Sequence, residues 1–199
     1  MNFKKLRSLY VLSCIVLCLI FLSPTLAVIV PIPEGQKFSE LWILGPAHMM
    51  EGYPFNVSAG KTYKVYLGVG NRIGHLGYYR VSVKVRTQSE LSPNSSSGAP
   101  SSLASLFEYN VFLRDDETWE REFSFSFEGV SFEENTCRVS KVLVGDYTVD
   151  LNKVAIWNDT TSAFYYELFF ELWIYNVASQ SFQFNNRWVG LWLNMSKPL

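Results

Sequence analysis

The chain has 199 residues, of which 48% are hydrophobic and 16% aromatic, and its net charge is −1. Residues 1–27 hold three of the 17 basic residues and no acidic one, which leaves 14 basic and 18 acidic residues in the remainder. A mildly acidic remainder argues against a protein that binds nucleic acid through its phosphates. About 165 residues form one domain that is large enough to bury a core.

The first 33 residues follow the pattern of a leader. Three basic residues, Lys4, Lys5 and Arg7, precede an uncharged apolar run from Leu9 to Val30, and Pro31-Ile-Pro33 ends it. A secretory signal has a basic start, an apolar stretch and a small-residue cleavage site. The segment Thr25-Leu-Ala27 supplies such a site, so cleavage after Ala27 is one prediction.

The same run also has the length of a membrane anchor. A transmembrane helix needs about 20 apolar residues, and Leu9 to Val30 supplies them if Pro24 is tolerated. We therefore interpret residues 1–33 as a signal peptide or a signal-anchor helix. The basic residues lie on the N-terminal side, so either fate places residues 34–199 outside the cell, membrane-anchored or secreted.

The rest of the chain alternates between apolar and polar residues, which is typical of β-strands. Strands are predicted at 38–45, 61–69, 80–86, 106–113, 119–127, 137–144, 146–156, 165–175 and 187–193. Residues 89–105 are rich in Ser, Pro, Gly and Ala and are predicted to form a flexible loop. Short strands without an amphipathic helix favour an all-β fold, an immunoglobulin-like antiparallel β-sandwich over residues 34–199.

Cysteines and glycosylation motifs fit an exported domain. Cys14 and Cys18 lie in the leader, so Cys137 cannot form an intramolecular disulfide in the exported part and is predicted to be a buried or semi-buried thiol. Asn-x-Ser/Thr motifs mark four candidate glycosylation sites in predicted surface turns. These four are Asn56, Asn94, Asn158 and Asn194.

Several segments resemble a known family. They are Glu34-Gly-x-Lys-Phe-Ser-Glu-Leu-Trp-Ile-Leu-Gly-Pro46, Tyr53-Pro-Phe-Asn56 and Leu113-Arg-Asp-Asp-Glu-Thr-Trp-Glu120. Together they resemble the archaeal domain-of-unknown-function family numbered sixteen-sixteen, over residues 34–128 and 163–196. The resemblance implies membrane-tethered, outward-facing immunoglobulin-like domains and carries no catalytic residue. The loop at 89–105 and an extra segment at 129–162 are expected departures from the family.

Four aromatic residues form the main candidate site. Phe169 and Trp173 are predicted to point outward from one strand, and Trp188 and Trp192 from the next. If the two strands pair, the four rings share one face and form a contact patch for a protein, a lipid or sugar rings. The alternative is that the segment 129–162, with Val142, Val144, Tyr147 and Val149, folds over these rings and buries them.

Other groups of polar residues give weaker signals. His48-Met49-Met50 with His75 contains soft-metal ligand types, and two acidic groups, 115–117 and 133–134, contain calcium ligand types. Both are interpreted as loop and surface residues, so no metal or cofactor is predicted. Glu167 and Glu171 could form a carboxylate pair of the kind used by glycosidases. They are interpreted as a solvated edge, and no enzyme is predicted.

Two functions remain from the sequence. The first is a non-enzymatic, membrane-tethered or secreted cell-surface module with a structural or protein-interaction role in the archaeal envelope. The second is a glycan-binding module that uses the outward aromatic face. The expected partners are the membrane, envelope proteins or glycans. The two functions differ in whether at least two of the four rings are exposed.

Overall fold

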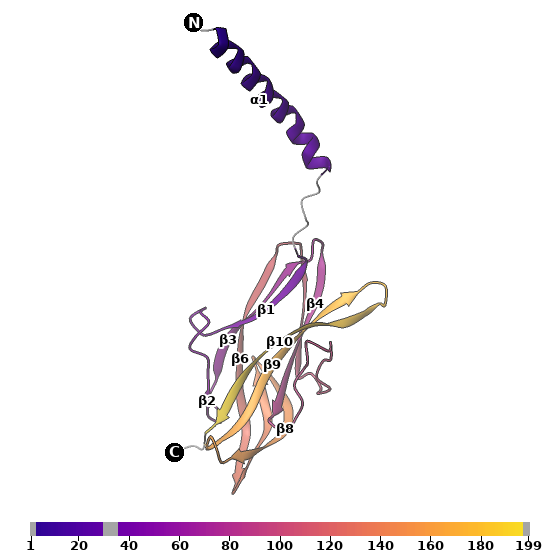
Figure 1. Ribbon diagram of the computed structural model, residues 1–199. Helices are drawn as coiled ribbons and strands as arrows, with labels where there is room; N and C mark the ends of the chain where they lie inside the picture. Colours follow the sequence, from indigo (N-terminus) through magenta and orange to yellow (C-terminus); the bar gives the residue numbers. More distant parts are fainter. Residues whose placement is uncertain (1–2, 30–35, 197–199) are drawn as a thin grey trace. The chain divides into compact units, whose positions relative to one another are not determined.

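The computed structural model describes residues 3–29 and 36–196, and the chain divides into two compact units (Figure 1). One unit is Met1–Lys37 and the other is Phe38–Leu199. The first contains the helix α1, Phe3–Ile29, in which Cys14 and Cys18 are exposed. Within the described part of the chain, no helix is long and apolar enough to cross a membrane. The predicted leader end at Pro31-Ile-Pro33 lies outside the described residues.

The second unit consists of ten strands joined by turns and loops. Nine of them lie where alternation predicts strands, and the two-residue strand β2 was not predicted. The strands are β1 (Phe38–Leu44), β2 (Asn56–Val57), β3 (Tyr63–Arg72), β4 (Gly77–Thr87), β5 (Phe107–Leu113), β6 (Thr118–Glu133), β7 (Thr136–Val144), β8 (Tyr147–Asn158), β9 (Ala163–Asn176) and β10 (Ser181–Met195).

All ten strands belong to one mixed sheet that curls strongly into a half-barrel. Its path runs β1-β3-β6-β7-β8-β9-β10-β2, and β4 pairs with both β5 and β9. The pairing is antiparallel except between β10 and β2. The second unit is therefore all-β as predicted, but its sheet is not a clear immunoglobulin-like sandwich. A sandwich needs two separate sheets, whereas Trp157 pairs with Phe164 and so joins β8 to β9.

The core lies between the two halves of the curled sheet, β1-β3-β6-β7-β8 and β5-β4-β9-β10-β2. Phe123 of β6 meets Phe170 of β9 edge to face, with ring centroids 5.0 Å apart. The predicted inward faces are confirmed, because Val81, Val83 and Val85 of β4 are buried. The same holds for Tyr166, Leu168, Phe170 and Leu172 of β9. Burial of this alternating apolar face drives the folding of the half-barrel.

The segment 129–162 is part of the sheet and not a separate lobe. It supplies the end of β6, all of β7 and β8, and the tight turn at Gly145, which has φ of 57°. Cys137 is fully buried, in agreement with the prediction. The Tyr166 hydroxyl donates a hydrogen bond of 2.5 Å to the carbonyl oxygen of Cys137, and burial raises the pKa of this phenol far above its usual value.

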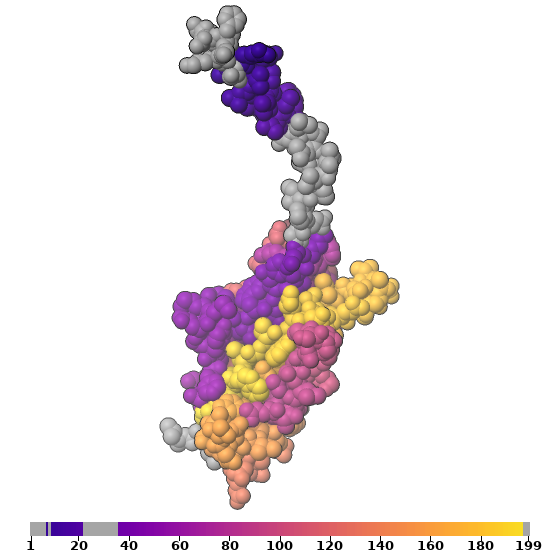
Figure 2. Space-filling view, viewed as in Figure 1, coloured from indigo at the N-terminus to yellow at the C-terminus, as the bar shows by residue number. Residues whose placement is uncertain are grey.

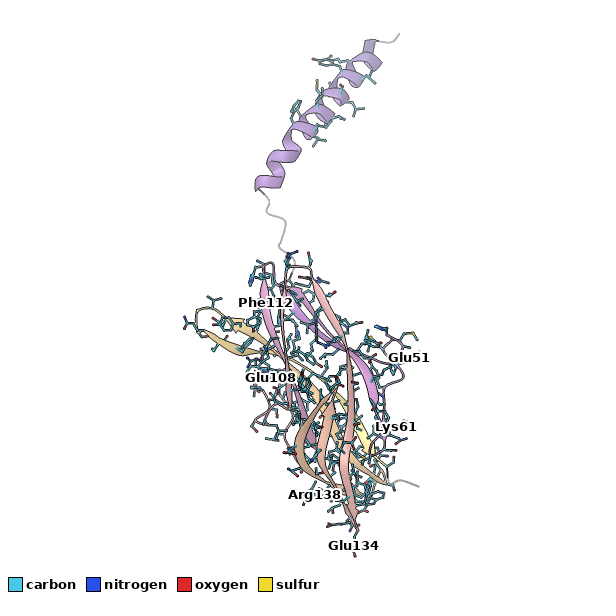
Figure 3. The ribbon with its side chains drawn as sticks, turned by 180° about the vertical axis from the view of Figure 1, so that it is seen from behind. Glu51, Lys61, Glu108, Phe112, Glu134 and Arg138 are labelled. Atoms are coloured by element: carbon cyan, nitrogen blue, oxygen red, sulfur yellow. The ribbon has the colours of Figure 1, made fainter. Side chains whose placement is uncertain are left out.

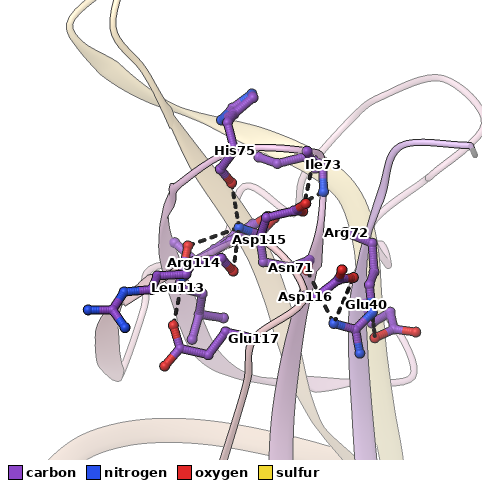
Figure 4. Close-up of polar contacts among 12 residues, drawn as sticks. Glu40, Asn71, Arg72, Ile73, His75, Leu113, Arg114, Asp115, Asp116 and Glu117 are labelled. Carbon is purple, nitrogen blue, oxygen red and sulfur yellow. Dashed lines mark hydrogen bonds and ion pairs between the residues drawn. The ribbon is translucent and has the colours of Figure 1, made fainter. Parts of the chain in front are cut away.

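A buried asparagine ties together the turns at one end of the sheet (Figure 4). Asn71, at the end of β3, is fully buried. Its side-chain Nδ2 donates to the carbonyl oxygens of His75, Leu113 and Arg114, at 2.8, 2.9 and 3.1 Å. Its Oδ1 accepts from the Tyr79 hydroxyl at 3.0 Å. This single side chain therefore connects the β3–β4 turn with the β5–β6 turn.

Candidate functional site

The outer face of the strands β5, β4, β9 and β10 is aromatic where a solvated sheet face is usually polar. At one end, one ring from each strand forms a row across the face. Tyr78 stacks on Phe112 with centroids 4.0 Å apart, and Tyr175 lies 5.4 Å from Phe182. Tyr78 joins the two pairs, because its ring lies 5.0 Å from that of Phe182. We call Tyr78, Phe112, Tyr175 and Phe182 the aromatic row.

The middle of the same face carries two buried ion pairs between β4 and β9. Lys84 Nζ lies 2.8 Å from Oε2 of Glu171, and the two side chains are 4% and 0% exposed. Arg86 pairs with Glu167, which is also buried. Burial raises the pKa of Glu167, and Arg86 opposes this shift. The interpretation of Glu167 and Glu171 as a solvated edge is therefore wrong.

The Ser-rich segment 88–105 covers these ion pairs. The amide of Ser101 donates to Oε1 of Glu171 at 2.6 Å, and its carbonyl oxygen accepts from Nζ of Lys84 at 2.9 Å. A Cβ at Gly98 would lie 3.3 Å from Oδ1 of Asn186, so the segment reaches β10. Figure 2 shows its magenta surface beside the yellow surface of β10. Backbone groups of this segment therefore form hydrogen bonds with the charged side chains of Lys84 and Glu171, which lie on the outer face of β4 and β9.

The four predicted patch residues lie on this face with different exposures. Phe169 is fully buried, Trp173 and Trp188 are half-buried, and Trp192 is 37% exposed. Phe169 and Trp188 are in edge-to-face contact at 6.3 Å, and the guanidinium of Arg86 lies 4.8 Å from the ring centre of Trp192. The rings therefore share a face, but they do not form an open platform.

The segment that covers this face differs from the predicted one, 129–162. Val142 and Val144 are buried in the core of the half-barrel, and Tyr147 is 64% exposed. The segment 129–162 is thus part of the sheet itself, and the Ser-rich segment 88–105 covers the outer face. Alternation identifies the outward face of a strand, but a distant segment decides whether water reaches that face.

Glu90 attaches the start of the covering segment to β8 through a hydrogen bond from Lys153. The Thr87 amide also donates to this carboxylate, at 2.9 Å. Burial acts to raise the pKa of Glu90, but the hydrogen bonds from Lys153 and Thr87 outweigh it and hold the pKa below its usual value. A carboxylate with a lowered pKa stabilises the fold above its unfolded-state pKa and loses this contribution as pH falls through the folded-state pKa.

We expect Glu90→Gln to lower the free energy of unfolding at neutral pH and to have a shrinking effect below the usual glutamate pKa of 4.5. Urea unfolding at several pH values from 7 to 3 measures this difference. Lys153→Met is the matched variant, because it removes the other half of the pair and should remove the same pH dependence. A difference between wild type and Glu90→Gln that stays constant over this range would contradict the assignment.

A pocket of about 310 Å³ lies where the pairing partner of β9 changes. Thr87 of β4 pairs with Tyr166, and Trp157 of β8 pairs with Phe164, so Tyr165 lies between the two partners. The pocket that results is called the junction pocket. It is lined by Thr87, Gln88, Ser89, Ile156, Trp157, Asn158 and Tyr165. Sequence reasoning missed it, although the adjacent Trp157 and Asn158 at a strand end were a usable signal.

The weaker candidate groups are engaged in local contacts. His48 stacks on Tyr66 at 3.5 Å and its Nδ1 lies 2.9 Å from Oε1 of Glu120, whereas His75 contacts the carbonyl oxygen of Leu76. In the acidic group 115–117, Asp115 accepts from the amide of Gly74. Across residues 3–29 and 36–196, no group of three or more His, Cys, Asp or Glu side chains could hold a metal ion.

The four glycosylation motifs have distinct surroundings. Asn94 is exposed, whereas Nδ2 of Asn194 donates to Oδ1 of Asn56 at 3.0 Å on the paired strands β10 and β2. Asn158 lines the junction pocket. Modification at Asn94 would therefore face solvent, and modification at Asn158 would begin at the pocket.

Comparison with solved structures gives only a distant likeness. Two structures of the β-glucosidase from Listeria innocua, with glucose and with gluconolactone, align at 9% identity with TM-scores of 0.39 and 0.37. Each alignment covers 82% of this chain but 17% of the enzyme, so the chain spans less than a fifth of its length. This likeness is too weak to indicate a shared fold or function. No curated protein matches the chain in sequence.

The family comparison is more direct. The model of the family described as "Domain of unknown function (DUF1616)" matches residues 32–156. The matched range contains the loop at 89–105 and most of 129–162, which were expected to depart from the family, and it ends before β9. The match covers more than half of the 199 residues. The chain therefore belongs to the DUF1616 family.

Proposed function

We propose that this chain is a non-enzymatic, extracytoplasmic binding module that docks a protein partner of the cell envelope through the aromatic row. The leader pattern supports export, because basic residues precede the apolar run of residues 9–30. The proposal requires only that the domain of residues 34–199 is exported. It holds for a domain that stays tethered to the membrane and for one released after Ala27.

The aromatic row is the observation that carries the protein-docking role. Protein interfaces are enriched in aromatic residues and Arg and depleted in Lys, Glu and Asp. Arg80 fits this pattern, because its guanidinium lies 4.0 Å from the ring centre of Phe182. Phe112 is 65% exposed at the end of the row, and Val177 in the β9–β10 turn is 80% exposed. The partner surface that fits is therefore apolar and uncharged.

The geometry of the unit supports this placement. Figure 3 shows Phe112 toward the end of the domain from which the β9–β10 hairpin projects, and Glu134 at the opposite end. The hairpin turn, residues 177–180, contains no charged residue. A partner that contacts Phe112 can thus also reach this turn without burying an unpaired charge.

Glycan binding is the second candidate function. The predicted four-ring platform does not favour it, because only Trp192 among the four rings is exposed. The junction pocket does favour it, because two aromatic residues and two residues with carboxamide side chains are among those that line it.

Photo-crosslinking in cells of the natural host tests the protein-docking role. We expect a photoreactive phenylalanine at position 112 to give a crosslinked adduct with one envelope protein or a second copy, identified by mass spectrometry. The matched control is position 147, since Tyr147 is 64% exposed and Phe112 is 65% exposed. No adduct at 112, or the same adducts at 112 and 147, would contradict docking at the row.

A further inference from the structure

We propose that the junction pocket binds one uncharged sugar ring and that a glycan attached to Asn158 is its source. This goes beyond the docking role, because the pocket lies at the β8–β9 end of the face and shares no residue with the aromatic row. The covalent source rests on the proposed export, whereas the affinity of the pocket for a sugar does not.

The pocket has the size and lining for a single ring. Its volume of about 310 Å³ lies at the lower end of the roughly 300–1,000 Å³ range of small-molecule pockets. None of its seven lining residues is charged, so it offers no counter-ion to a charged ligand, which would lose its hydration there without compensation. An uncharged ring avoids this penalty.

The lining combines flat apolar surfaces with polar groups. Two of the lining residues, Trp157 and Tyr165, are aromatic, and two others, Gln88 and Asn158, carry carboxamides. The Trp157 ring also packs edge to face on the buried Phe164, with ring centroids 4.9 Å apart. A sugar ring has the matching chemistry, because its C–H groups pack on aromatic rings while its hydroxyls exchange hydrogen bonds with amides. Tyr165 continues the apolar surface beyond the pocket, since its ring lies 6.3 Å from that of Trp192 and 6.2 Å from that of Phe55.

The turn after β8 aims the Asn158 side chain at this lining. Its Oδ1 accepts from the amides of Thr160 and Thr161, at 3.1 and 3.2 Å. These two bonds orient the carboxamide so that Nδ2 donates to Oε1 of Gln88, at 3.3 Å. A sugar joined to Nδ2 therefore starts beside the pocket. Asn94 makes a similar pair of turn contacts, through the amides of Ser96 and Ser97, but does not line this pocket.

Attachment is compatible with these contacts. A bond forms between Nδ2 of Asn158 and the anomeric carbon of an activated glycosyl phosphate, the phosphate group leaves, and Nδ2 loses one proton. The remaining N–H can still donate to Gln88. Asn158 heads the motif Asn158-Asp-Thr160, which is the acceptor pattern for this reaction.

The first test uses the full chain without glycosylation and N-acetylglucosamine as the probe. We expect the sugar to shift the NMR signal of the Trp157 indole N–H, assigned with Trp157→Phe. The shift should be lost in Tyr165→Ala and in Gln88→Ala, and kept in Tyr147→Ala, which removes an exposed ring outside the pocket. Gln88 is exposed, so its variant keeps the test valid if Tyr165→Ala does not fold.

The second test uses the chain produced in a glycosylating host. We expect a glycan at Asn158 and no further shift on adding N-acetylglucosamine, because the pocket is already filled. Thr160→Ala removes the acceptor motif but keeps the Asn158 side chain and the amide of residue 160, so it should restore the shift.

The outcomes separate the claims. No shift in the unglycosylated chain, or a shift that survives both pocket variants, overturns the sugar pocket. A shift that persists in the glycosylated chain, or an unmodified Asn158, overturns the covalent source and leaves a pocket for the glycan of another molecule. Failure of export or of docking at Phe112 leaves the first test unaffected.

Discussion

Replacing Lys84 with methionine is expected to lower the free energy of unfolding by about 3–5 kcal/mol. Lys84 and Glu171 are 4% and 0% exposed and lie 2.8 Å apart. Methionine fills similar space but leaves the Glu171 carboxylate buried without its counter-ion. The cost is the desolvation of that carboxylate, which the single bond from the Ser101 amide does not offset.

Urea unfolding with a matched control measures this effect. Lys64→Met removes an ammonium group from another cross-strand pair, in which Lys64 and Glu122 are 51% and 47% exposed, and little change is expected there. The double variant Lys84→Met/Glu171→Met should recover part of the loss, since it removes both buried charges. Equal effects of Lys84→Met and Lys64→Met would show that water reaches Glu171.

The same double variant should loosen the covering segment. Both backbone groups of Ser101 lose their partners when Lys84 and Glu171 are replaced, because the amide donates to one side chain and the carbonyl oxygen accepts from the other. The segment 88–105 then keeps its attachment through Glu90 and Lys153. Faster hydrogen exchange at the Ser101 amide, with little change in the β4 amides, is the expected signature.

Much of the strand content could be predicted from alternation. Val81, Val83 and Val85 lie at every second position and are buried as predicted. The pairing order could not be predicted, because nothing in the local pattern shows that Trp157 pairs with Phe164. This pair turns two expected sheets into one curled sheet. Alternation reports the faces of each strand, and pairing depends on contacts between strands that are distant in sequence.

The candidate site was harder to predict for a related reason. The outward positions of β4, such as Lys84 and Arg86, have the polar character of a solvated face, yet both side chains are buried. Their cover is a Ser-rich segment whose composition suggests no packing. This segment packs through hydrogen bonds of its backbone groups, as at Ser101. Such bonds cannot be predicted from hydrophobic periodicity, because every residue type except proline has the same backbone donor and acceptor.

Asn71 is the second position where a large effect is expected. Its Nδ2 faces three carbonyl oxygens. An aspartate side chain in the same conformation would put a carboxylate oxygen in place of Nδ2, facing those three acceptors. We expect Asn71→Asp to lower the free energy of unfolding at neutral pH by about 3 kcal/mol or more, because the buried carbonyl groups lose their donor and a charge is buried beside them. Asn94→Asp is the matched control, since exposed Asn94 uses only its Oδ1 as an acceptor for the Ser96 and Ser97 amides.

The pH dependence of Asn71→Asp separates a lost donor from lost packing. Burial and the facing carbonyl oxygens should raise the pKa of the new carboxyl above its unfolded value of about 3.9. Protonation restores one donor, so the loss of stability should shrink as pH falls through the raised pKa. Asn71→Ala has no group to protonate, and its loss should stay constant between pH 7 and pH 4. If the two variants lose the same stability at every pH in urea unfolding, the carbonyl oxygens do not depend on a donor at position 71, and the two turns are held together by packing alone.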